Sequence, residues 1–292
     1  MRGGTRWPSP LAIIERGPYP DGVPRQSISS LDDPRLQPFR ALKKSNFTRW
    51  SGQFIAEGEK LVRRLLASPF PVESVLAGQQ FADGIAPLVP ADVPLLVVED
   101  ACVPGLVGFN FHRGLLACGR RLPELAVADF AGRLPSPATL VICPEIQDPE
   151  NLGGVLRTSC ALGVDAVVLG SGSADPFSRR VLRVSMGTAF QVPILQSRDL
   201  AGDLAWLRAS GGFQLVATVL DETAERLEMA LRAPRVGLLF GNEAHGLDQS
   251  WLEICDKRVT IPMRRGTDSL NVAAACAVVL HHFTRVARGA WG

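Results

Sequence analysis

Short apolar runs alternate with segments of helical spacing from residue 139 onward. The runs are rich in β-branched residues and bounded by Gly, Pro or Asp, which is typical of strands. We expect strands at Thr139–Cys143, Ala166–Leu169, Val192–Leu195, Gln214–Val219, Val236–Phe240 and Arg258–Ile261. We expect helices between them, at Gly154–Leu162, Pro176–Met186, Leu200–Ala209, Ala224–Leu231 and Gln249–Cys255. Alternation of this kind predicts a mostly parallel sheet with helices on both faces.

Residues 39–119 show a smaller α/β pattern. The segment Gly58–Ala67 has helical spacing, with one apolar stripe made of Leu61, Val62, Leu65 and Leu66. Strands are expected at Phe54–Glu57, Val72–Leu76, Leu95–Val98 and Gly114–Cys118. The pattern predicts a small domain with its own core.

The length of 292 residues suits two domains. Residues 1–38 carry seven prolines and little periodicity, which predicts a flexible tail. Residues 120–138 hold three prolines around one weak helical segment, Glu124–Phe130, and are expected to be a linker. Residues 139–292 then form the second domain.

The stretch Ile261–Asn271 joins the last expected strand to a helix of small residues at about Leu270–His282. Pro and Gly make the stretch a loop, and Asp268 or Ser269 is a natural N-cap for the helix. A helix N-terminus offers free backbone N–H groups that can meet a ligand. An ordinary β-to-α turn is the alternative interpretation.

The net charge of the chain limits how it could bind RNA. The net charge is only +2, so any contact with RNA must come from local basic clusters. One such cluster interleaves aromatic residues with Lys43, Lys44, Arg49, Arg63 and Arg64. It suits phosphate contact and base stacking, although a solvated face around a buried Trp50 fits the same residues.

The six cysteines include no CxxC pair and no zinc-like spacing, so we expect reduced thiols and no metal. The longest apolar runs are too short for a signal peptide or a membrane span, which predicts a soluble cytoplasmic protein. No G-x-G-x-x-G follows the first strand of the larger domain, which argues against a dinucleotide-binding enzyme.

Three loops at expected strand ends carry the most unusual residues, and in open α/β sheets ligands bind at such ends. Their motifs are N-x-G-x-x-x-R-T at 151–158, G-N-E-x-x-G-L at 241–247, and I-P-M at 261–263 followed by S-L-N-V at 269–272. In order and spacing they closely resemble the SpoU (TrmH-type) RNA 2′-O-ribose methyltransferases of the SPOUT superfamily. The match runs from about residue 139 to 288. Residues 45–119 also look like that family's N-terminal substrate-binding domain, which resembles a ribosomal-protein fold.

The resemblance implies an α/β methyltransferase domain with a deep trefoil knot, S-adenosylmethionine bound in the knot, and a homodimer whose active site draws on both subunits. It implies that the methyl-donor pocket is lined by Gly241, Ile261, Leu270 and, less closely, Thr218. Glycine permits close approach of the backbone to a ligand, and Ile and Leu supply apolar walls. Core packing around a turn is the alternative role for these residues.

Arg157 matches the family's catalytic arginine, with Asn151 near the start of the same segment. A guanidinium normally stays protonated, so we expect Arg157 to grip a phosphate and orient the ribose rather than take a proton. Glu243, Ser269 and Asn271 are the remaining polar candidates, with Glu243 expected to hold the loops and Asn151. The alternatives are a surface ion pair for Arg157 and a bare N-cap for Ser269. We expect His245 to be loop surface.

The sequence therefore predicts a metal-independent, S-adenosylmethionine-dependent RNA 2′-O-ribose methyltransferase acting on ribosomal RNA or transfer RNA. The N-terminal domain favours ribosomal RNA. A non-catalytic RNA-binding or ribosome-assembly protein with the same fold is the main alternative. An α/β enzyme with a nucleotide cofactor such as NAD is the second alternative.

Overall fold

The computed structural model describes residues 25–30, 32–40, 51–98 and 114–287. They divide into two compact units. The first contains the described part of Met1–Leu122 together with Phe177–Arg183, and the second contains Pro123–Pro176 and the chain from Val184 onward. Each unit is described by itself.

The first unit is built on a five-stranded sheet. In spatial order its strands are β1 (Arg25–Ile28), β4 (Leu95–Val98), β3 (Val72–Gly78), β5 (Leu115–Arg120) and β2 (Gln53–Glu57). β1 and β3 run parallel to β4, whereas β5 is antiparallel to both β3 and β2. The helices of this unit are α1 (Gln37–Arg40), α3 (Glu59–Leu66) and α4 (Gln79–Ile85).

Helix α3 lies against β5 and β2 by the apolar stripe that its spacing predicts. All four stripe residues are buried, while Glu59, Lys60 and Arg63 are exposed. Burying four such side chains contributes roughly 6–10 kcal/mol before the cost of ordering the chain.

An aromatic cluster explains why Phe177–Arg183 belongs to the first unit. The Phe177 ring stacks on Phe54 at 5.2 Å and meets Phe70 at 5.3 Å between centroids. Arg179 then pairs with Glu57 at 2.7 Å. This segment was expected in a helix of the second domain, but its aromatic ring finds its partners in the first unit.

The expected tail of residues 1–38 differs from the structure at its C-terminal end. Residues 25–28 form β1, which pairs with β4, and Ile28, Leu36 and Phe39 are buried in the core of the first unit. A few widely spaced apolar residues are enough to hold this segment in the first unit, because β4 also supplies hydrogen bonds to its backbone. Residues 1–24 lie outside the described residues.

The expected linker also takes part in packing. β5 extends to Arg120, and α6 (Val127–Ala131) places Val127 and Ala131 in the core of the second unit, where α6 contacts α9. The short apolar pattern of this segment was too weak to show that it packs onto a sheet.

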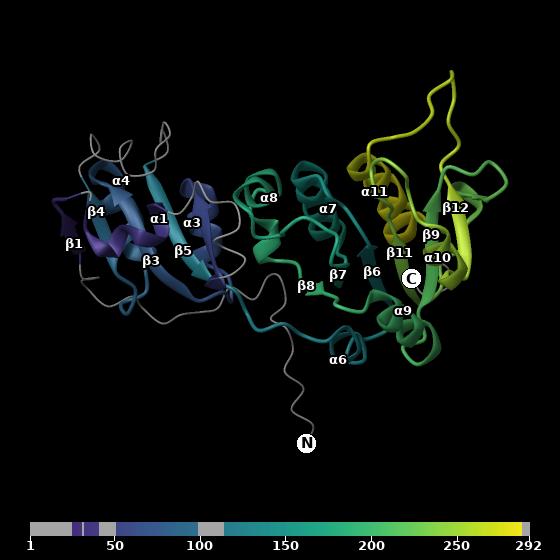
Figure 1. Cartoon of the computed structure of the whole chain (residues 1–292), viewed down its shortest axis with the longest axis horizontal. Coiled ribbons are helices and arrows are strands. Elements are labelled where there is room, and N and C mark those ends of the chain that lie inside the picture. Colours follow the sequence, from purple (N-terminus) through teal and green to yellow (C-terminus); the bar gives the residue numbers. More distant parts are fainter. Residues whose placement is uncertain (1–24, 31, 41–50, 99–113, 288–292) are drawn as a thin grey trace. The chain divides into compact units, whose positions relative to one another are not determined.

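The second unit is built on a seven-stranded sheet in which every pairing between named strands is parallel. In spatial order its strands are β10 (Glu225–Arg226), β12 (Lys257–Thr260), β9 (Gln214–Val219), β11 (Arg235–Leu239), β6 (Ala138–Cys143), β7 (Ala166–Leu169) and β8 (Ile194–Gln196) (Figure 1). The prediction of an α/β fold with a mostly parallel sheet is confirmed.

Helices cover both faces of this sheet (Figure 1). Leu140 and Ile142 of β6 join one core cluster with residues of α6 and α9 (Leu200–Ala209), while Val141 and Cys143 are buried on the opposite face. On that opposite face α7 (Pro149–Leu162) packs against α11 (Val272–His281), which continues as a π-helical turn at His282–Val286. The second unit also contains α10 (Gln249–Ile254), whereas α8 (Arg179–Val184) belongs to the first unit except for its last residue.

Two expected helices differ in the structure. Ala224–Leu231 is not a helix, because Glu225 and Arg226 pair with β12 as an edge strand and a 3-10 turn follows at Leu227–Met229. Residues with good helix propensity lie here, but the free edge of β12 offers backbone partners that outweigh propensity. The helix expected at Pro176–Met186 is shorter, at Arg179–Val184.

In the described part of the chain, no helix combines the length and apolar character that crossing a bilayer requires.

Candidate functional site

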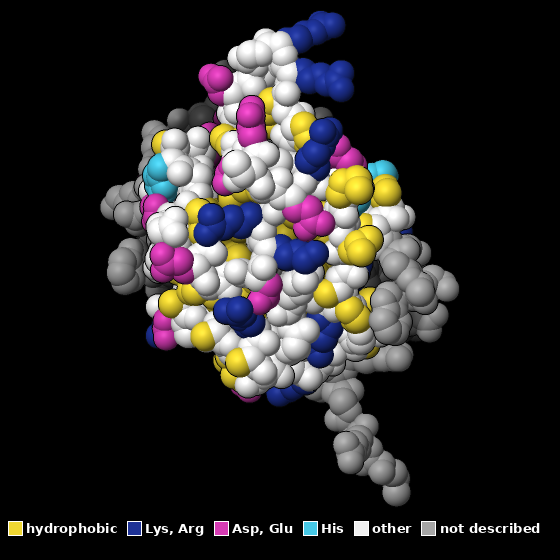
Figure 2. Space-filling view, turned by 90° about the vertical axis from the view of Figure 1, so that its right-hand side faces the viewer, with side chains coloured by type: hydrophobic (Ala, Val, Ile, Leu, Met, Phe, Trp, Pro, Cys, Tyr) yellow, Lys and Arg dark blue, Asp and Glu magenta, His cyan; other side chains and the backbone are white. Residues whose placement is uncertain are grey.

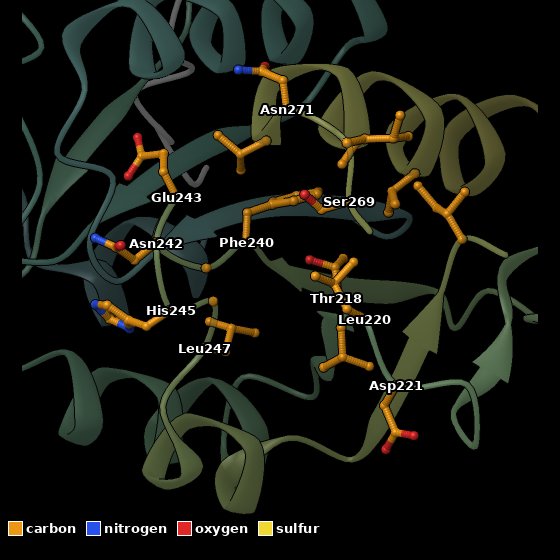
Figure 3. Close-up of a pocket in the computed structure, with 18 of the residues that line it drawn as sticks. Thr218, Leu220, Asp221, Phe240, Asn242, Glu243, His245, Leu247, Ser269 and Asn271 are labelled. Atoms are coloured by element: carbon orange, nitrogen blue, oxygen red, sulfur yellow. The ribbon is translucent and has the colours of Figure 1, made fainter. Parts of the chain in front are cut away.

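A cavity of about 570 Å³ lies at the carboxyl ends of β9, β11 and β12. The segments that line it are the residues that follow β9, the loop after β11, and both ends of the stretch that joins β12 to α11. Figure 3 shows Thr218 and Leu220 facing Glu243 and Asn271 across the cavity. Two of the three sequence motifs therefore meet in one place, and Asn151 of the first motif lies on the same rim.

All four residues expected in the methyl-donor pocket line this cavity, namely Thr218, Gly241, Ile261 and Leu270. The Thr218 hydroxyl donates to the Leu239 carbonyl at 2.8 Å, so it closes a contact between β9 and β11. Leu270 is 38% exposed and Leu220 is 64% exposed. Such exposure of large apolar side chains within one cavity leaves surface that an apolar ligand group would cover.

The loop after β11 is closed on itself. Asn242 and Gly246 exchange two backbone hydrogen bonds at 2.8 and 3.0 Å, and the Asn242 amide donates to the Glu145 carbonyl at 3.2 Å. A Cβ on Gly241 would lie 2.5 Å from the Leu247 nitrogen and would also clash with Gly246. Gly241 is therefore required by the loop's own backbone, in addition to any approach of a ligand.

A chain of side-chain hydrogen bonds joins the three motifs. Asn271 donates to Asn151 at 2.7 Å, and Asn151 donates to Glu243 at 3.0 Å. The Glu243 carboxylate also accepts from the backbone nitrogens of Gln147 at 3.4 Å and Asp148 at 3.2 Å. Glu243 thus accepts two donors from the loop before α7 and one from the first turn of α7, which leaves it little capacity to act as a base.

The N-cap of α11 is Asn271, so the prediction of Asp268 or Ser269 is wrong. The Asn271 side-chain oxygen accepts from the Ala273 and Ala274 nitrogens at 2.9 and 3.4 Å. The helix starts at Val272, because Asn271 itself has an extended backbone. Ser269 is exposed and lines the cavity instead.

Arg157 is not among the residues that line this cavity. Its side chain is exposed on α7, six residues beyond Asn151, which is about 9 Å along a helix axis. The structure therefore brings Asn151, Glu243, Ser269 and Asn271 together and leaves Arg157 outside this cavity.

The expected basic cluster is only partly described. Lys43, Lys44 and Arg49 lie outside the described residues. Arg63 pairs with Glu59 at 2.8 Å on α3 and also donates to the Gly84 carbonyl at 3.3 Å, whereas Arg64 is partly buried on the same helix.

His245 lies at the edge of the cavity, half exposed. It is 3.4 Å from Asp248 and 3.9 Å from Glu145. In the described ranges no group of three or more His, Cys, Asp or Glu side chains is arranged to hold a metal ion.

Two buried thiols lie near the cavity, on β6 and α11. Burial raises the pKa of Cys143 and of Cys276 well above that of an ordinary thiol, because a thiolate would be poorly solvated there. Both are therefore protonated packing residues rather than nucleophiles.

Sequence reasoning missed several lining residues, including Leu220, Leu247, Arg258 and Met263. Leu220 follows the last residue of β9, and Met263 lies three residues beyond the end of β12. Their position at the carboxyl end of a parallel strand was the signal that could have identified them.

Comparison with known proteins adds to this geometry. A family model described as the SpoU rRNA Methylase family matches residues 138–281. A Mycobacterium bovis protein named an uncharacterized tRNA/rRNA methyltransferase is 38% identical over 275 residues, or 91% of this chain and 94% of the relative. The Bacillus subtilis 23S rRNA (guanosine(2553)-2′-O)-methyltransferase is 28% identical over 88% of this chain and 98% of its own. A crystal structure of an AdoMet-bound rRNA methyltransferase from Sinorhizobium meliloti aligns with TM-score 0.79 and 26% identity, covering 89% of this chain and 98% of that one.

The fold and the cavity at its strand ends define an α/β methyltransferase that acts on RNA. The chain belongs to the SpoU rRNA methylase family. This confirms the recognition of the SpoU family, the prediction of an RNA 2′-O-ribose methyltransferase, and S-adenosylmethionine as the cofactor.

The residues present fit this cofactor. The cavity volume lies within the range of about 300–1,000 Å³ that is usual for small-ligand sites. Its walls combine exposed leucines with backbone groups of the closed loop after β11. Adenine needs flat apolar walls and a few backbone hydrogen bonds, and this lining offers both.

Proposed function

We propose that this enzyme methylates a ribose 2′-hydroxyl of ribosomal RNA. The observation that carries the proposal is the hydrogen-bonded chain Asn271–Asn151–Glu243, which connects all three motifs at the rim of the cavity. The printed name of the Bacillus subtilis relative, a 23S rRNA 2′-O-methyltransferase, supports ribosomal RNA over transfer RNA.

The bound cofactor would supply an electrophilic methyl group on its sulfonium. Thr218, Gly241, Ile261 and Leu270 are proposed to hold it, since all four line the cavity. Ser269 and Asn271 lie at the mouth between this wall and α11, where a ribose would enter. In the reaction an O–CH₃ bond forms while the S–CH₃ bond breaks, and the hydroxyl proton leaves to solvent.

Positioning is the main contribution that we assign to the protein. Asn151 has both amide atoms engaged, so its orientation is fixed before RNA binds. Glu243 is proposed to hold Asn151 and the loop before α7, because three donors already occupy its carboxylate. Alignment of a hydroxyl with an electrophile can supply several kcal/mol of a reaction barrier.

Arg157 is proposed to act in the site of a second subunit. It is exposed on α7 and does not line the cavity of its own chain, which supports a homodimer with composite active sites. A guanidinium there would bind the phosphate next to the target ribose and orient the 2′-oxygen. A dimer also agrees with the exposed Val278 on α11.

The remaining assignments follow from the family. We propose that Ile261–Asn271 and the loop after β11 belong to a deep trefoil knot, since both line the same cavity. The first unit is proposed to bind RNA through Lys43, Lys44, Arg49, Arg63 and Arg64, and the second unit is proposed to carry out methyl transfer. We propose a cytoplasmic location, where ribosomal RNA is made in bacteria such as those of the relatives.

The proposal is tested by methyl transfer from labelled S-adenosylmethionine to unmodified ribosomal RNA. The product should resist alkaline cleavage at one ribose. Arg157→Ala should lose at least about 100-fold in rate while still binding the cofactor. Arg198→Ala is the matched control, since Arg198 is 87% exposed and pairs with Glu124 far from the motifs in sequence. Label on a base, or full activity of Arg157→Ala, would contradict the proposal.

A mixing experiment tests the composite site. Arg157→Ala and Asn271→Ala should each have strongly reduced activity alone. Randomly mixed dimers should recover roughly a quarter of wild-type activity, because half of them are mixed and each mixed dimer has one intact site. No recovery after verified subunit exchange would place Arg157 and Asn271 in the same subunit's site. Retained RNA binding with no methylation by the wild type would favour the non-catalytic alternative.

A further inference from the structure

We propose that Arg264 and Arg265, at the tip of the β12–α11 segment, clamp the RNA phosphate backbone beside the target nucleotide. The inference rests on the proposed function and assigns it a specific contact. The RNA would be held at this tip while its target ribose enters the cavity.

The tip projects from the rim of the cavity. Both stems of the segment line the cavity, with Ile261 and Met263 on one side and Ser269 and Leu270 on the other. Between these stems, residues 264–268 are all exposed. Figure 1 shows the segment extending beyond the helices and strands of the second unit, and Figure 2 shows Lys and Arg side chains at its end.

The backbone at the tip is unusual for an arginine. Arg265 has φ of +58° and Gly266 has φ of +71°, and the Thr267 nitrogen donates to the Arg264 carbonyl at 3.3 Å. A turn with positive φ at both central residues favours Asn or Gly at the first of them. An arginine is strained there, and strain that the fold retains points to a use for the side chain.

Several basic residues of the second unit are already paired with carboxylates. Arg226 pairs with Glu228, Lys257 with Glu225, and Arg208 with Asp256. Within the described ranges, neither Arg264 nor Arg265 has a carboxylate at ion-pairing distance. Their guanidinium groups are therefore available to a ligand.

Phosphate is the ligand chemistry that these features fit. Two adjacent guanidiniums on an exposed turn can each donate paired N–H groups to phosphate oxygens. The low net charge of the chain makes such a local contact more important, because no general basic field attracts RNA. Their position beyond the cavity rim would place them on nucleotides that flank the target rather than on the target itself.

The test compares Arg264→Ala/Arg265→Ala with Arg198→Ala/Arg226→Ala, which removes the same charge from exposed, ion-paired positions. Binding to deproteinised bacterial ribosomal RNA is measured from low to moderate salt. The tip variant should bind at least about tenfold more weakly, and the slope of log K against log salt should shrink by roughly 1–2. The KM for RNA should rise while kcat and cofactor affinity stay near wild type. The control should change little.

Single substitutions separate charge from turn geometry. Arg265→Asn suits the positive φ, so its melting temperature should equal or exceed that of the wild type while RNA affinity falls. Arg265→Lys should keep part of the affinity. Equal RNA binding and KM in the wild type and the tip variant, with an active wild type, would overturn this inference alone. Equal loss in the tip variant and the control would also overturn it, as a general charge effect. A wild type that neither binds nor methylates ribosomal RNA would overturn the proposed function as well.

Discussion

The Asn271 side-chain amide donates to the Asn151 side-chain oxygen at 2.7 Å, although the two residues are 120 positions apart in the chain. The oxygen of the same Asn271 side chain accepts from the Ala273 and Ala274 nitrogens and so caps α11. One side chain therefore sets both the start of α11 and the orientation of a polar group at the start of α7. Because Asn151 in turn donates to Glu243, a substitution of any one of these three residues should alter the orientation of the other two side chains.

Asn271→Ala should affect both stability and catalysis. Loss of the N-cap should lower the free energy of unfolding by about 1 kcal/mol. Loss of the bond to Asn151 should lower methyl transfer at least about tenfold, because Glu243 alone then orients the Asn151 amide. Denaturant unfolding and single-turnover methylation measure the two effects.

Asn271→Ser is the matched variant for that experiment. Serine is also a good N-cap, so stability should return close to that of the wild type. Its side chain is shorter and should not reach Asn151, so methyl transfer should stay low. Recovery of both properties in the serine variant would show that the cap alone matters.

Gly241→Ala should disrupt the closed loop after β11. The added methyl would fall against the backbone of Gly246 and Leu247, and backbone cannot yield as a flexible side chain does. We expect a loss of about 1–3 kcal/mol in unfolding free energy and a cofactor affinity at least about tenfold weaker. Gly84→Ala on α4 is the control, since its Cβ would meet open space and should leave both quantities unchanged or slightly improved. Wild-type cofactor affinity in Gly241→Ala would show that cofactor binding does not depend on the closed form of this loop.

Leu220→Ala should weaken cofactor binding without unfolding the protein. Leu220 lines the cavity and is 64% exposed, so little of it packs in the empty protein and more would be covered by a ligand. A loss of about 1 kcal/mol, or roughly fivefold in Kd, is expected in calorimetric titration. Leu231→Ala is the matched control, because Leu231 is 74% exposed and does not line the cavity. Equal effects of the two variants would argue against Leu220 as part of the wall.

Central strands of the larger sheet were predictable from the sequence. Ala166–Leu169 and Gln214–Val219 occur at the predicted bounds. The first is apolar and buried throughout, and the second has three consecutive buried apolar residues, which is typical of strands covered on both faces. The edge strand at Glu225–Arg226 was not predictable. Its two residues are polar, and they form a strand only because β12 offers a free edge.

The sequence motifs named several residues that line the cavity, but they did not show how these residues contact one another, and they missed others such as Leu220. The motifs identified Asn151, Glu243 and Asn271, but their partners lie 92 and 120 positions apart in the chain. Short sequence patterns do not show which of such distant residues will hydrogen bond to each other. The N-cap of α11 was predicted at the wrong residue for a related reason. Several residues before the helix have side chains that can cap it, and the contact of Asn271 with Asn151, which favours Asn271 as the cap, exists only in the folded structure.

The stability of the protein near neutral pH should depend on Asp165, which precedes β7. Its carboxylate accepts from the Thr139 nitrogen at 2.7 Å. Burial raises the pKa of Asp165 above its ordinary value, and the bond from Thr139 and the charges of Arg232 and Arg235 offset this only in part. A raised pKa means that the folded state holds the proton more tightly than the unfolded state. The contribution of this group is therefore fully present below the unfolded pKa and is lost as pH rises through the folded pKa.

Asp165→Asn should remove this dependence. The amide oxygen can still accept from Thr139, and no buried charge remains, so the variant should be more stable than the wild type at pH 7 and not at pH 3. Melting temperatures across this range measure the difference. Asp129→Asn removes the same charge from an exposed carboxyl on α6 and should follow the wild-type curve. A loss of stability in Asp165→Asn at pH 7 would mean that attraction to Arg232 and Arg235 outweighs the cost of burial, and that the carboxylate stabilises the fold as an ion.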